Sequence, residues 1–221
     1  MSKSKNKIFA NMKLKNYEEL NEAQEFSEND PFTIDRYRQF FRHFPKQAKF
    51  ILDIGCNTGK GGKILKELDN NLHLIGLDCL ASRLDKIPVN IYEQKLVSYS
   101  TNISLPDSSV DVIIAGEFIE HLYFEDVSQT IREFYRLIKP KGRLLLTTPN
   151  PNYLRLKLTG ESVLGGAHVS QHYVSDLKKE LAKVGFSRIK ILGSGKMSRL
   201  LSENFPWLSL YGSYLALADK N

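Results

Sequence analysis

The sequence predicts an α/β fold built on a doubly wound, mostly parallel sheet. From residue 48 onward, short apolar runs alternate with amphipathic helical patterns, and this alternation is typical of a parallel sheet covered by helices on both faces. The loop at residues 55–59 begins and ends with glycine and follows directly on the first apolar run. Sheets of this kind bind ligands at such loops, beyond the carboxyl ends of their strands.

Seven apolar or alternating runs, bounded by glycine, proline or polar residues, are expected to be strands. They are residues 49–54, 73–78, a part of 89–97, 108–116, 142–148, 187–194 and 210–219. Helical spacing of apolar residues predicts four helices. They are residues 32–44, 62–68, 127–138 and 175–186. We expect the break at Pro140–Gly142 to end the third of these helices. Because no long helical pattern separates the last two strands, we expect them to pair antiparallel.

The 221 residues suffice for one well-buried domain with an N-terminal extension. We expect a flexible basic tail over residues 1–15, a helical cap over 16–47 and the α/β domain over 48–221. The net charge is +6, but residues 16–35 carry seven acids and no Lys or Arg. Since the remainder holds no dense stripe of basic residues, a solvated surface is favoured over a groove that follows nucleic-acid phosphates.

The sequence gives no sign of export or membrane insertion. No apolar run reaches the roughly 18–20 residues that span a bilayer, and the lysine-containing N-terminus lacks the apolar segment of a secretory signal. Two cysteines, Cys56 and Cys79, are too few for a disulfide framework or a structural zinc site. We therefore expect a cytoplasmic protein, monomeric or homodimeric, with reduced thiols.

The glycine loop carries an acid that phosphate-binding loops lack. Asp53 stands two residues before Gly55, where its charge would repel a phosphate at the helix N-terminus. A P-loop has four residues between its glycines and ends in Lys-Ser or Lys-Thr. Here three residues separate Gly55 from Gly59, and Gly61 follows Lys60. The ligand of this loop is therefore not expected to be a nucleotide triphosphate.

A second acid indicates which ligand would fit. Asn57 stands where the dinucleotide fingerprint requires a glycine, and Asp78 ends the second strand, 23 residues after Gly55. Acids at about that distance accept hydrogen bonds from ribose hydroxyls. An adenosine that carries positive charge instead of phosphates fits both Asp53 and Asp78. S-adenosylmethionine, with its ammonium and sulfonium groups, has this chemistry.

Four segments resemble class I S-adenosylmethionine-dependent methyltransferases. D-I-G-C-N-T-G (53–59) resembles the family's first motif, [D/E]-x-G-x-G-x-G, with Asn57 in place of the middle glycine. Later blocks of the family, in the expected order, are matched by LPDSSVDVIIAGEFIEHL (105–122), REFYRLIKPKGRLLLTTPN (132–150) and HVSQHYVSDLKKELAKVGF (168–186). The resemblance covers about residues 48–194. Within the family, the sequence is similar to methyltransferases of type 11/23 and to ubiquinone-pathway O-methyltransferases. The resemblance implies a Rossmann-like sheet of seven strands with an antiparallel last strand.

The resemblance also implies roles for individual residues. Asp53, Gly55 and Gly59 would border the methionyl part of the cofactor, and Asp78 would bind the ribose. Thr101 or Asn102 would replace the acid that many relatives use for the adenine amine. The full set expected to contact S-adenosylmethionine is Asp53, Gly55, Cys56, Asn57, Gly59, Asp78, Cys79, Thr101, Asn102 and Glu117.

A cluster of acids and a histidine follows the fourth strand. If a helix begins at Glu117, the spacing puts Glu117, Glu120 and His121 on one face, and these groups suit Mg²⁺, Mn²⁺ or Zn²⁺. A similar Glu-x-x-Glu-His cluster binds a divalent metal in small-RNA 3′-end 2′-O-methyltransferases, where a later histidine, matched here by His168, completes the site. Similar Leu-Glu-His segments order a loop in relatives that use no metal, so that role stays open. Without a metal, His121 and Glu117 are the expected catalytic residues.

We therefore expect methyl transfer from S-adenosylmethionine to an oxygen of a small molecule, such as a sugar, a quinol or a lipid-linked intermediate. GEFIEH (116–121) lacks the Asn/Asp-Pro-Pro-aromatic motif of many nitrogen methyltransferases. Tyr153 and His168, in the segment after the fifth strand, are the expected acceptor contacts. Two alternatives remain open: an RNA 2′-O-methyltransferase, and a non-catalytic subunit that binds S-adenosylmethionine.

Overall fold

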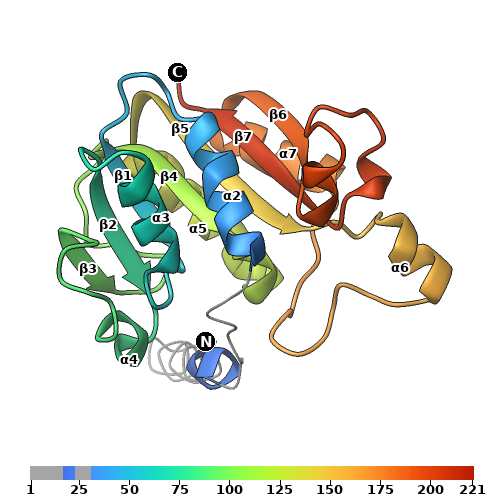
Figure 1. Ribbon diagram of the computed structural model, residues 1–221, viewed down its shortest axis with the longest axis horizontal. Coiled ribbons are helices and arrows are strands. Elements are labelled where there is room, and N and C mark those ends of the chain that lie inside the picture. Colours follow the sequence, from blue (N-terminus) through green and yellow to red (C-terminus); the bar gives the residue numbers. More distant parts are fainter. Residues whose placement is uncertain (1–16, 23–30) are drawn as a thin grey trace, which may run out of the picture.

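The computed structural model of the protein describes residues 17–22 and 31–221 (Figure 1). Its strands are β1 (Phe50–Ile54), β2 (His73–Asp78), β3 (Gln94–Val97), β4 (Val110–Gly116), β5 (Ile138–Pro149), β6 (Ser187–Ser194) and β7 (Ser213–Asp219). They form one sheet in the order β3-β2-β1-β4-β5-β7-β6. Strands β1 to β5 pair parallel, and β7 is antiparallel to both β5 and β6. The predicted doubly wound, Rossmann-like sheet with an antiparallel last strand is confirmed.

Helices cover both faces of this sheet (Figure 1). They are α2 (Pro31–Arg42), α3 (Lys60–Leu68), α4 (Ala81–Leu84), α5 (Phe124–Leu137), α6 (Leu154–Thr159) and α7 (Val174–Val184). The described chain also has 3₁₀ turns: η1 (Ile119–His121) between β4 and α5, and η2 (Lys196–Arg199) and η3 (Leu208–Leu210) between β6 and β7. The four predicted helices correspond to α2, α3, α5 and α7. In the part of the chain that the structure describes, no helix is long and apolar enough to cross a bilayer.

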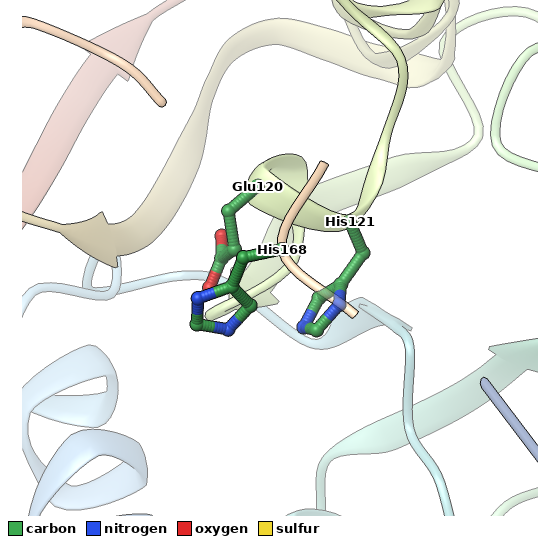
Figure 2. Close-up of side chains that lie close together, drawn as sticks. All are labelled: Glu120, His121 and His168. Atoms are coloured by element: carbon green, nitrogen blue, oxygen red, sulfur yellow. The ribbon is translucent and has the colours of Figure 1, made fainter. Parts of the chain in front are cut away.

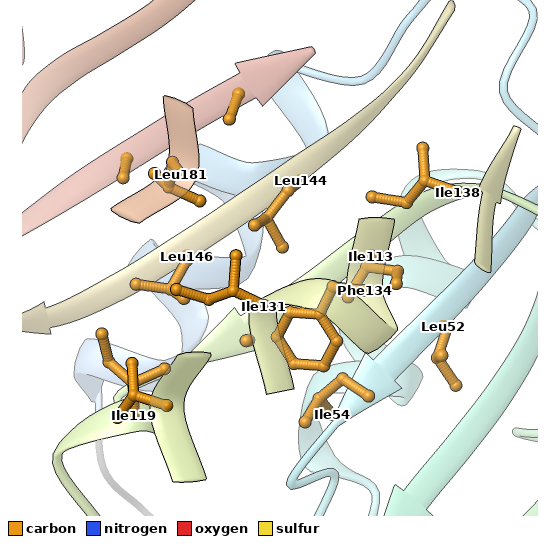
Figure 3. Close-up of a cluster of buried hydrophobic side chains, with 14 of the residues drawn as sticks. Leu52, Ile54, Ile113, Ile119, Ile131, Phe134, Ile138, Leu144, Leu146 and Leu181 are labelled. Atoms are coloured by element: carbon orange, nitrogen blue, oxygen red, sulfur yellow. The ribbon is translucent and has the colours of Figure 1, made fainter. Parts of the chain in front are cut away.

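Alternation along β1 divides the core into two layers. Leu52 and Ile54 belong to the cluster that α5 and α7 cover, shown in Figure 3, in which Phe134 is fully buried. Ile51 belongs to the opposite cluster, which includes Phe40 of α2. Each fully buried Leu or Ile contributes about 1.5–3 kcal/mol to folding. Because side chains alternate between the faces of a strand, Asp53 shares the face of Ile51 and lies on the side of α2 and α3.

The start of β5 differs from the prediction. The break at Pro140–Gly142 was expected to separate a helix from a strand at 142–148, but β5 already begins at Ile138. Val110 pairs with Ile138 and Val112 with Arg143, so the register shifts and the residues between them bulge out. Proline has no N–H to donate to a ladder and is found at such bulges.

The predicted basic tail at residues 1–15 lies outside the described residues, and the proposed division into tail, cap and domain stays a prediction. The described part of the cap is residues 17–22 together with α2. Tyr37 and Phe40 of α2 are buried against the α3 side of the sheet.

Candidate functional site

The glycine loop after β1 has a backbone that its glycines make possible. Gly55 has a φ of +67° and Gly59 a φ of +83°. Residues other than glycine rarely adopt such values. A Cβ at Gly55 would lie 2.9 Å from Cδ2 of Phe118, and one at Gly59 would lie 2.8 Å from Cγ2 of Ile87. Asn57, at φ +51°, is one of the few other residue types that tolerate this region. The loop is thus tightly fixed at the carboxyl end of β1.

Asp78, at the end of β2, holds this loop in place. Its Oδ2 accepts a hydrogen bond from the N–H of Asn57 at 3.0 Å, and its Oδ1 accepts one from the N–H of Leu80 at 3.0 Å. Nη1 of Arg83 lies 3.8 Å from Oδ1. A carboxylate has about four lone-pair sites, so both oxygens retain capacity for further donors such as ligand hydroxyls.

Asp53 is fully buried beneath the loop. The hydroxyl of Tyr37 donates to its Oδ1 at 2.7 Å, and the hydroxyl of Tyr92 donates to its Oδ2 at 2.5 Å. Burial raises the pKa of Asp53 to about 7, although the two tyrosine hydrogen bonds lower it. Asp53 therefore lies below the loop and has no open surface of its own.

The sequence assigned neither tyrosine to this carboxylate. The aromatic spacing of residues 32–44 favoured a helix that packs on the domain, with an aromatic face bordering a ligand cleft as the alternative, and Tyr92 stands in a segment interpreted as a strand. Gly61 is the one sequence feature that could have indicated a close neighbour such as Tyr37. A Cβ at Gly61 would lie 1.9 Å from Cζ of the Tyr37 ring. A glycine in the first turn of a helix leaves room for a close neighbour.

The other expected cofactor residues lie around the same edge of the sheet. Cys56 is buried and donates its N–H to the carbonyl of Leu77, and Cys79 is half-buried; both are free thiols. Thr101 and Asn102 lie in the turn after β3, where Gln129 of α5 donates to the carbonyl of Thr101. The carboxyl ends of β1, β2 and β3 thus carry the predicted set at one edge, apart from Glu117, which follows β4.

Beyond β4, three side chains converge, as Figure 2 shows: Glu120, His121 and His168. Their potential metal-ligand atoms all lie within 4.8 Å of one another. The two imidazole rings are 4.9 Å apart between centroids and meet edge to face. Glu120 and His121 belong to η1, and His168 comes from the loop after α6. The N–H groups of Val169 and Ser170 both donate to the carbonyl of Glu120, which fixes that loop against η1.

Both histidines are oriented through their Nδ1 atoms. Nδ1 of His121 lies 3.0 Å from the carbonyl oxygen of Ala167, and Nδ1 of His168 lies 2.9 Å from that of Val163. Because a carbonyl oxygen only accepts, each Nδ1 carries the proton and each Nε2 presents a lone pair. Metal-binding histidines are typically held in this way. Burial and the neighbouring His168 lower the pKa of His121 to about 4, so this ring is neutral at pH 7.

Glu120 is a buried acid in which only one of the two carboxyl oxygens has a hydrogen-bond partner among the described residues. Its Oε2 accepts a hydrogen bond from the hydroxyl of Thr148 at 3.0 Å, but its Oε1 is buried with no partner among the described residues. Burial, with a further contribution from Glu117, raises the pKa of Glu120 well above its ordinary value. A cation at this point would offset the cost of burying the charged form.

Glu117 lies apart from these three donors. The helix that would have placed it beside Glu120 does not begin there: η1 begins at Ile119 and is a single 3₁₀ turn, since Glu117 has a φ of +50°. Its Oε2 accepts a hydrogen bond from Ser213 at 3.0 Å, and its Oε1 is 3.9 Å from Nε of Arg36. Arg36, which was not predicted from the sequence, places its positively charged guanidinium group, from α2, near the end of β4.

Tyr153 precedes α6, with its N–H bonded to the carbonyl of Asn150. Its ring lies near Gly212, where a Cβ would be 3.8 Å from Cε1 of the tyrosine. His168 lies further along the same connection, between α6 and α7.

Comparison with known proteins agrees with this geometry. Residues 52–146 match the family described as methyltransferase domain. A probable S-adenosylmethionine-dependent methyltransferase of Mycolicibacterium smegmatis is 27% identical over 145 residues, which are 65% of this chain and 54% of that protein. Over these residues the chain is similar to S-adenosylmethionine-dependent methyltransferases. The chain spans about half the length of the mycobacterial relatives that it matches.

Solved structures share the fold of this methyltransferase domain. A SAM-dependent methyltransferase from Archaeoglobus fulgidus superposes with a TM-score of 0.67 at 23% identity, over 85% of this chain and 92% of that one. The small RNA methyltransferase HEN1 superposes with a TM-score of 0.68 at 17% identity, over 90% of this chain and 27% of that one. At these identities the likeness concerns the fold.

Proposed function

We propose that this chain transfers the methyl group of S-adenosylmethionine to a hydroxyl oxygen of a small molecule, with a divalent ion held at Glu120, His121 and His168. The observation that carries the proposal is the convergence of two imidazoles on a buried, half-satisfied carboxyl group. The expected acceptor is a sugar, a quinol or a lipid-linked intermediate.

The cofactor would lie across the carboxyl ends of β1 and β2. Asp78 would accept hydrogen bonds from the ribose hydroxyls, and the glycine loop would admit the methionyl part close to the backbone. The negative charge of Asp53, beneath the loop, would favour the ammonium and sulfonium groups. Arg36, which is 18% exposed at its side chain and lies 3.9 Å from Glu117, would meet the carboxylate of the methionyl part.

The three donors fit a divalent ion. Ligand atoms bound to one ion at about 2.0–2.2 Å lie about 3–4.4 Å apart, so donors within 4.8 Å of one another need only small side-chain movements. Nitrogen and carboxylate ligands suit Mn²⁺ or Zn²⁺ best, with Mg²⁺ as the harder alternative. A divalent ion held there would lower the pKa of a nearby hydroxyl group.

The residues of the chain itself supply orientation. The pKa of His121, about 4, leaves Nε2 free at pH 7 but makes it a weak base for an alcohol. This favours a ligand role over a general-base role. Methyl transfer forms the oxygen–carbon bond, breaks the carbon–sulfur bond and releases the acceptor proton to solvent, so alignment of the two substrates is the main requirement.

The direct test combines binding with product analysis. Calorimetric titration with S-adenosylmethionine and S-adenosylhomocysteine should show one shared site. Incubation with polyhydroxyl acceptors in the presence of Mn²⁺ should yield O-methyl products detected by mass spectrometry. Tight binding of NAD with no binding of S-adenosylmethionine would contradict the proposal.

A second candidate is an RNA 2′-O-methyltransferase. It is supported by the Glu-x-x-Glu-His pattern with a later histidine, which resembles small-RNA methyltransferases, and by the fold likeness to HEN1. Methylation of an RNA with a 3′-terminal 2′-hydroxyl, but not of its 2′-deoxy counterpart, would favour this candidate. Its RNA affinity should then fall steeply with salt, because phosphate contacts release counterions.

A further inference from the structure

Residues 17–22, here called the strap, are helical and lie beyond the carboxyl ends of the sheet, close to α4 (Figure 1). The strap is joined to three parts of the domain that are far apart in sequence. Tyr17 is 6% exposed and belongs to the apolar cluster that includes Leu77 at the end of β2 and Ile103. The strap is therefore packed into the domain at the edge where the cofactor residues gather.

One attachment is to the start of α5. The hydroxyl of Tyr17 donates to Oδ2 of Asp126 at 2.5 Å and accepts from the N–H of Tyr123 at 2.8 Å. The rings of Tyr17 and Tyr123 lie 5.0 Å apart between centroids. The hydroxyl thus satisfies a backbone donor at the helix N-terminus and a carboxylate at once.

Two further attachments join the strap to the turn after β3 and to α4. The hydroxyl of Tyr99, in the turn after β3, donates to Oε1 of Glu18 at 2.5 Å. A guanidinium nitrogen of Arg83, on α4, donates to the carbonyl of Asn21. Another nitrogen of the same guanidinium lies 3.8 Å from Oδ1 of Asp78. Arg83 therefore joins the strap directly to the carboxylate proposed for the ribose.

These contacts surround the place proposed for the nucleoside. Asp78 marks the ribose, and the turn that holds Tyr99 also holds Thr101 and Asn102, proposed for the adenine. The strap is fixed to that turn through Tyr99, to α4 through Arg83 and to α5 through Asp126. A nucleoside at Asp78 would lie between the strap and the strand ends.

We propose that residues 17–22 complete the nucleoside half of the cofactor site and that Tyr17 is the latch that holds this wall in place. The inference rests on the proposed cofactor site. The strap shields the bound nucleoside from water, and the cofactor product leaves when the Tyr17 latch opens. Tyr17 is a positioning residue, since it acts through the strap and α5.

Hydrogen exchange of the full chain tests the placement. Saturating S-adenosylhomocysteine should slow amide exchange in the glycine loop at 55–59 and in the strap together. Protection of the loop with unchanged exchange in the strap would overturn the inference and leave the proposed cofactor site intact. Absence of protection at both would contradict the cofactor site and the inference with it.

The latch is tested by Tyr17→Phe, which keeps the ring and removes the hydroxyl. Stopped-flow measurement should show S-adenosylhomocysteine leaving about tenfold faster, as expected for the loss of about two hydrogen bonds. Tyr135→Phe is the matched control, because Tyr135 lies further along α5 against Phe186 and should leave the rate unchanged. A lower melting temperature of Tyr17→Phe with an unchanged dissociation rate would show a purely structural role and overturn the latch.

Discussion

The Nδ1 atoms of His121 and His168 each donate to a backbone carbonyl, and this decides what the two rings can do. Both Nε2 lone pairs are left available, and Oε1 of Glu120 lies buried beside them without a partner in the described structure. A cation beside these groups would offset the cost of burying Glu120 in its ionised form.

Removal of the Asp78 carboxylate tests the cofactor site at this scale. Asp78→Ala should weaken binding of S-adenosylmethionine by about 1–3 kcal/mol, because hydrogen bonds to a charged acceptor are lost. Calorimetry checks the value, and circular dichroism checks that the loop anchored at Asn57 has not unfolded the domain. An unchanged affinity would remove Asp78 from the site.

Asp53 predicts a pH dependence of stability. Its pKa is about 7 in the folded protein and 3.8 in the unfolded chain, so the folded state binds more protons between these values. The free energy of unfolding should therefore fall as the pH rises from about 4 to 7, by at most about 1.4 kcal/mol per pH unit from this group. Urea unfolding of Asp53→Asn should lack this component. A variant whose stability follows the same pH slope as the wild type would rule out the shifted carboxyl.

The residues of the cofactor loop could be predicted because glycine spacing and strand-end acids are visible in one short segment. The hydroxyls on Asp53 could not, because Tyr37 and Tyr92 reach it from α2 and from the chain before β3. Such convergence depends on tertiary packing, which local spacing does not encode.

At the scale of elements, α2 and α3 meet at a glycine. Gly61 lies under the ring of Tyr37, the residue that also donates to Asp53, so the contact between the two helices and the charge beneath the cofactor loop depend on the same small residue. Tight helix packing at glycine leaves little room for adjustment.

Gly61→Ala should displace Tyr37 and lower stability by about 1–3 kcal/mol, because the new Cβ would overpack the contact. It should also weaken S-adenosylmethionine binding through the loss of the Tyr37–Asp53 hydrogen bond. Thermal unfolding and calorimetry check the two effects. Lys63→Ala, on the exposed side of α3, is the control. Equal melting temperatures for both variants would show that α2 is free to move.

Elements with strong periodicity were predicted well, and short irregular ones were not. The apolar runs of β1, β2 and β4 are bounded by turn residues and gave correct positions. The 3₁₀ turn η1 replaced the expected helix because Glu117 adopts a left-handed conformation, and β5 began early through a bulge at Pro140. Both outcomes depend on neighbouring strands rather than on local propensity.

At the scale of the whole molecule, residues 1–15 are predicted to be dispensable. They are polar and lysine-rich and precede the first apolar pattern. A chain that starts at Asn16 should melt within a few degrees of the full chain and bind S-adenosylmethionine equally well. A large loss of stability would mean that Ile8, Phe9 or Met12 packs against the domain.

The fold of the whole chain followed from its alternation of strands and helices, which admits few topologies. The approach of His168 to His121 did not follow from spacing, since 46 residues separate them; only the resemblance to known methyltransferases indicated it. The loop that carries His168 is held by backbone bonds to Glu120, which no side-chain pattern reveals.

The measurement that tests the central claim most directly is methyl transfer before and after exhaustive chelation. Treatment with a chelator should abolish turnover of a hydroxyl acceptor while leaving the calorimetric affinity for S-adenosylmethionine unchanged, and added Mn²⁺, Mg²⁺ or Zn²⁺ should restore it. His121→Ala should show the same loss without restoration by metal. Full turnover of the chelated, metal-free protein would contradict the account.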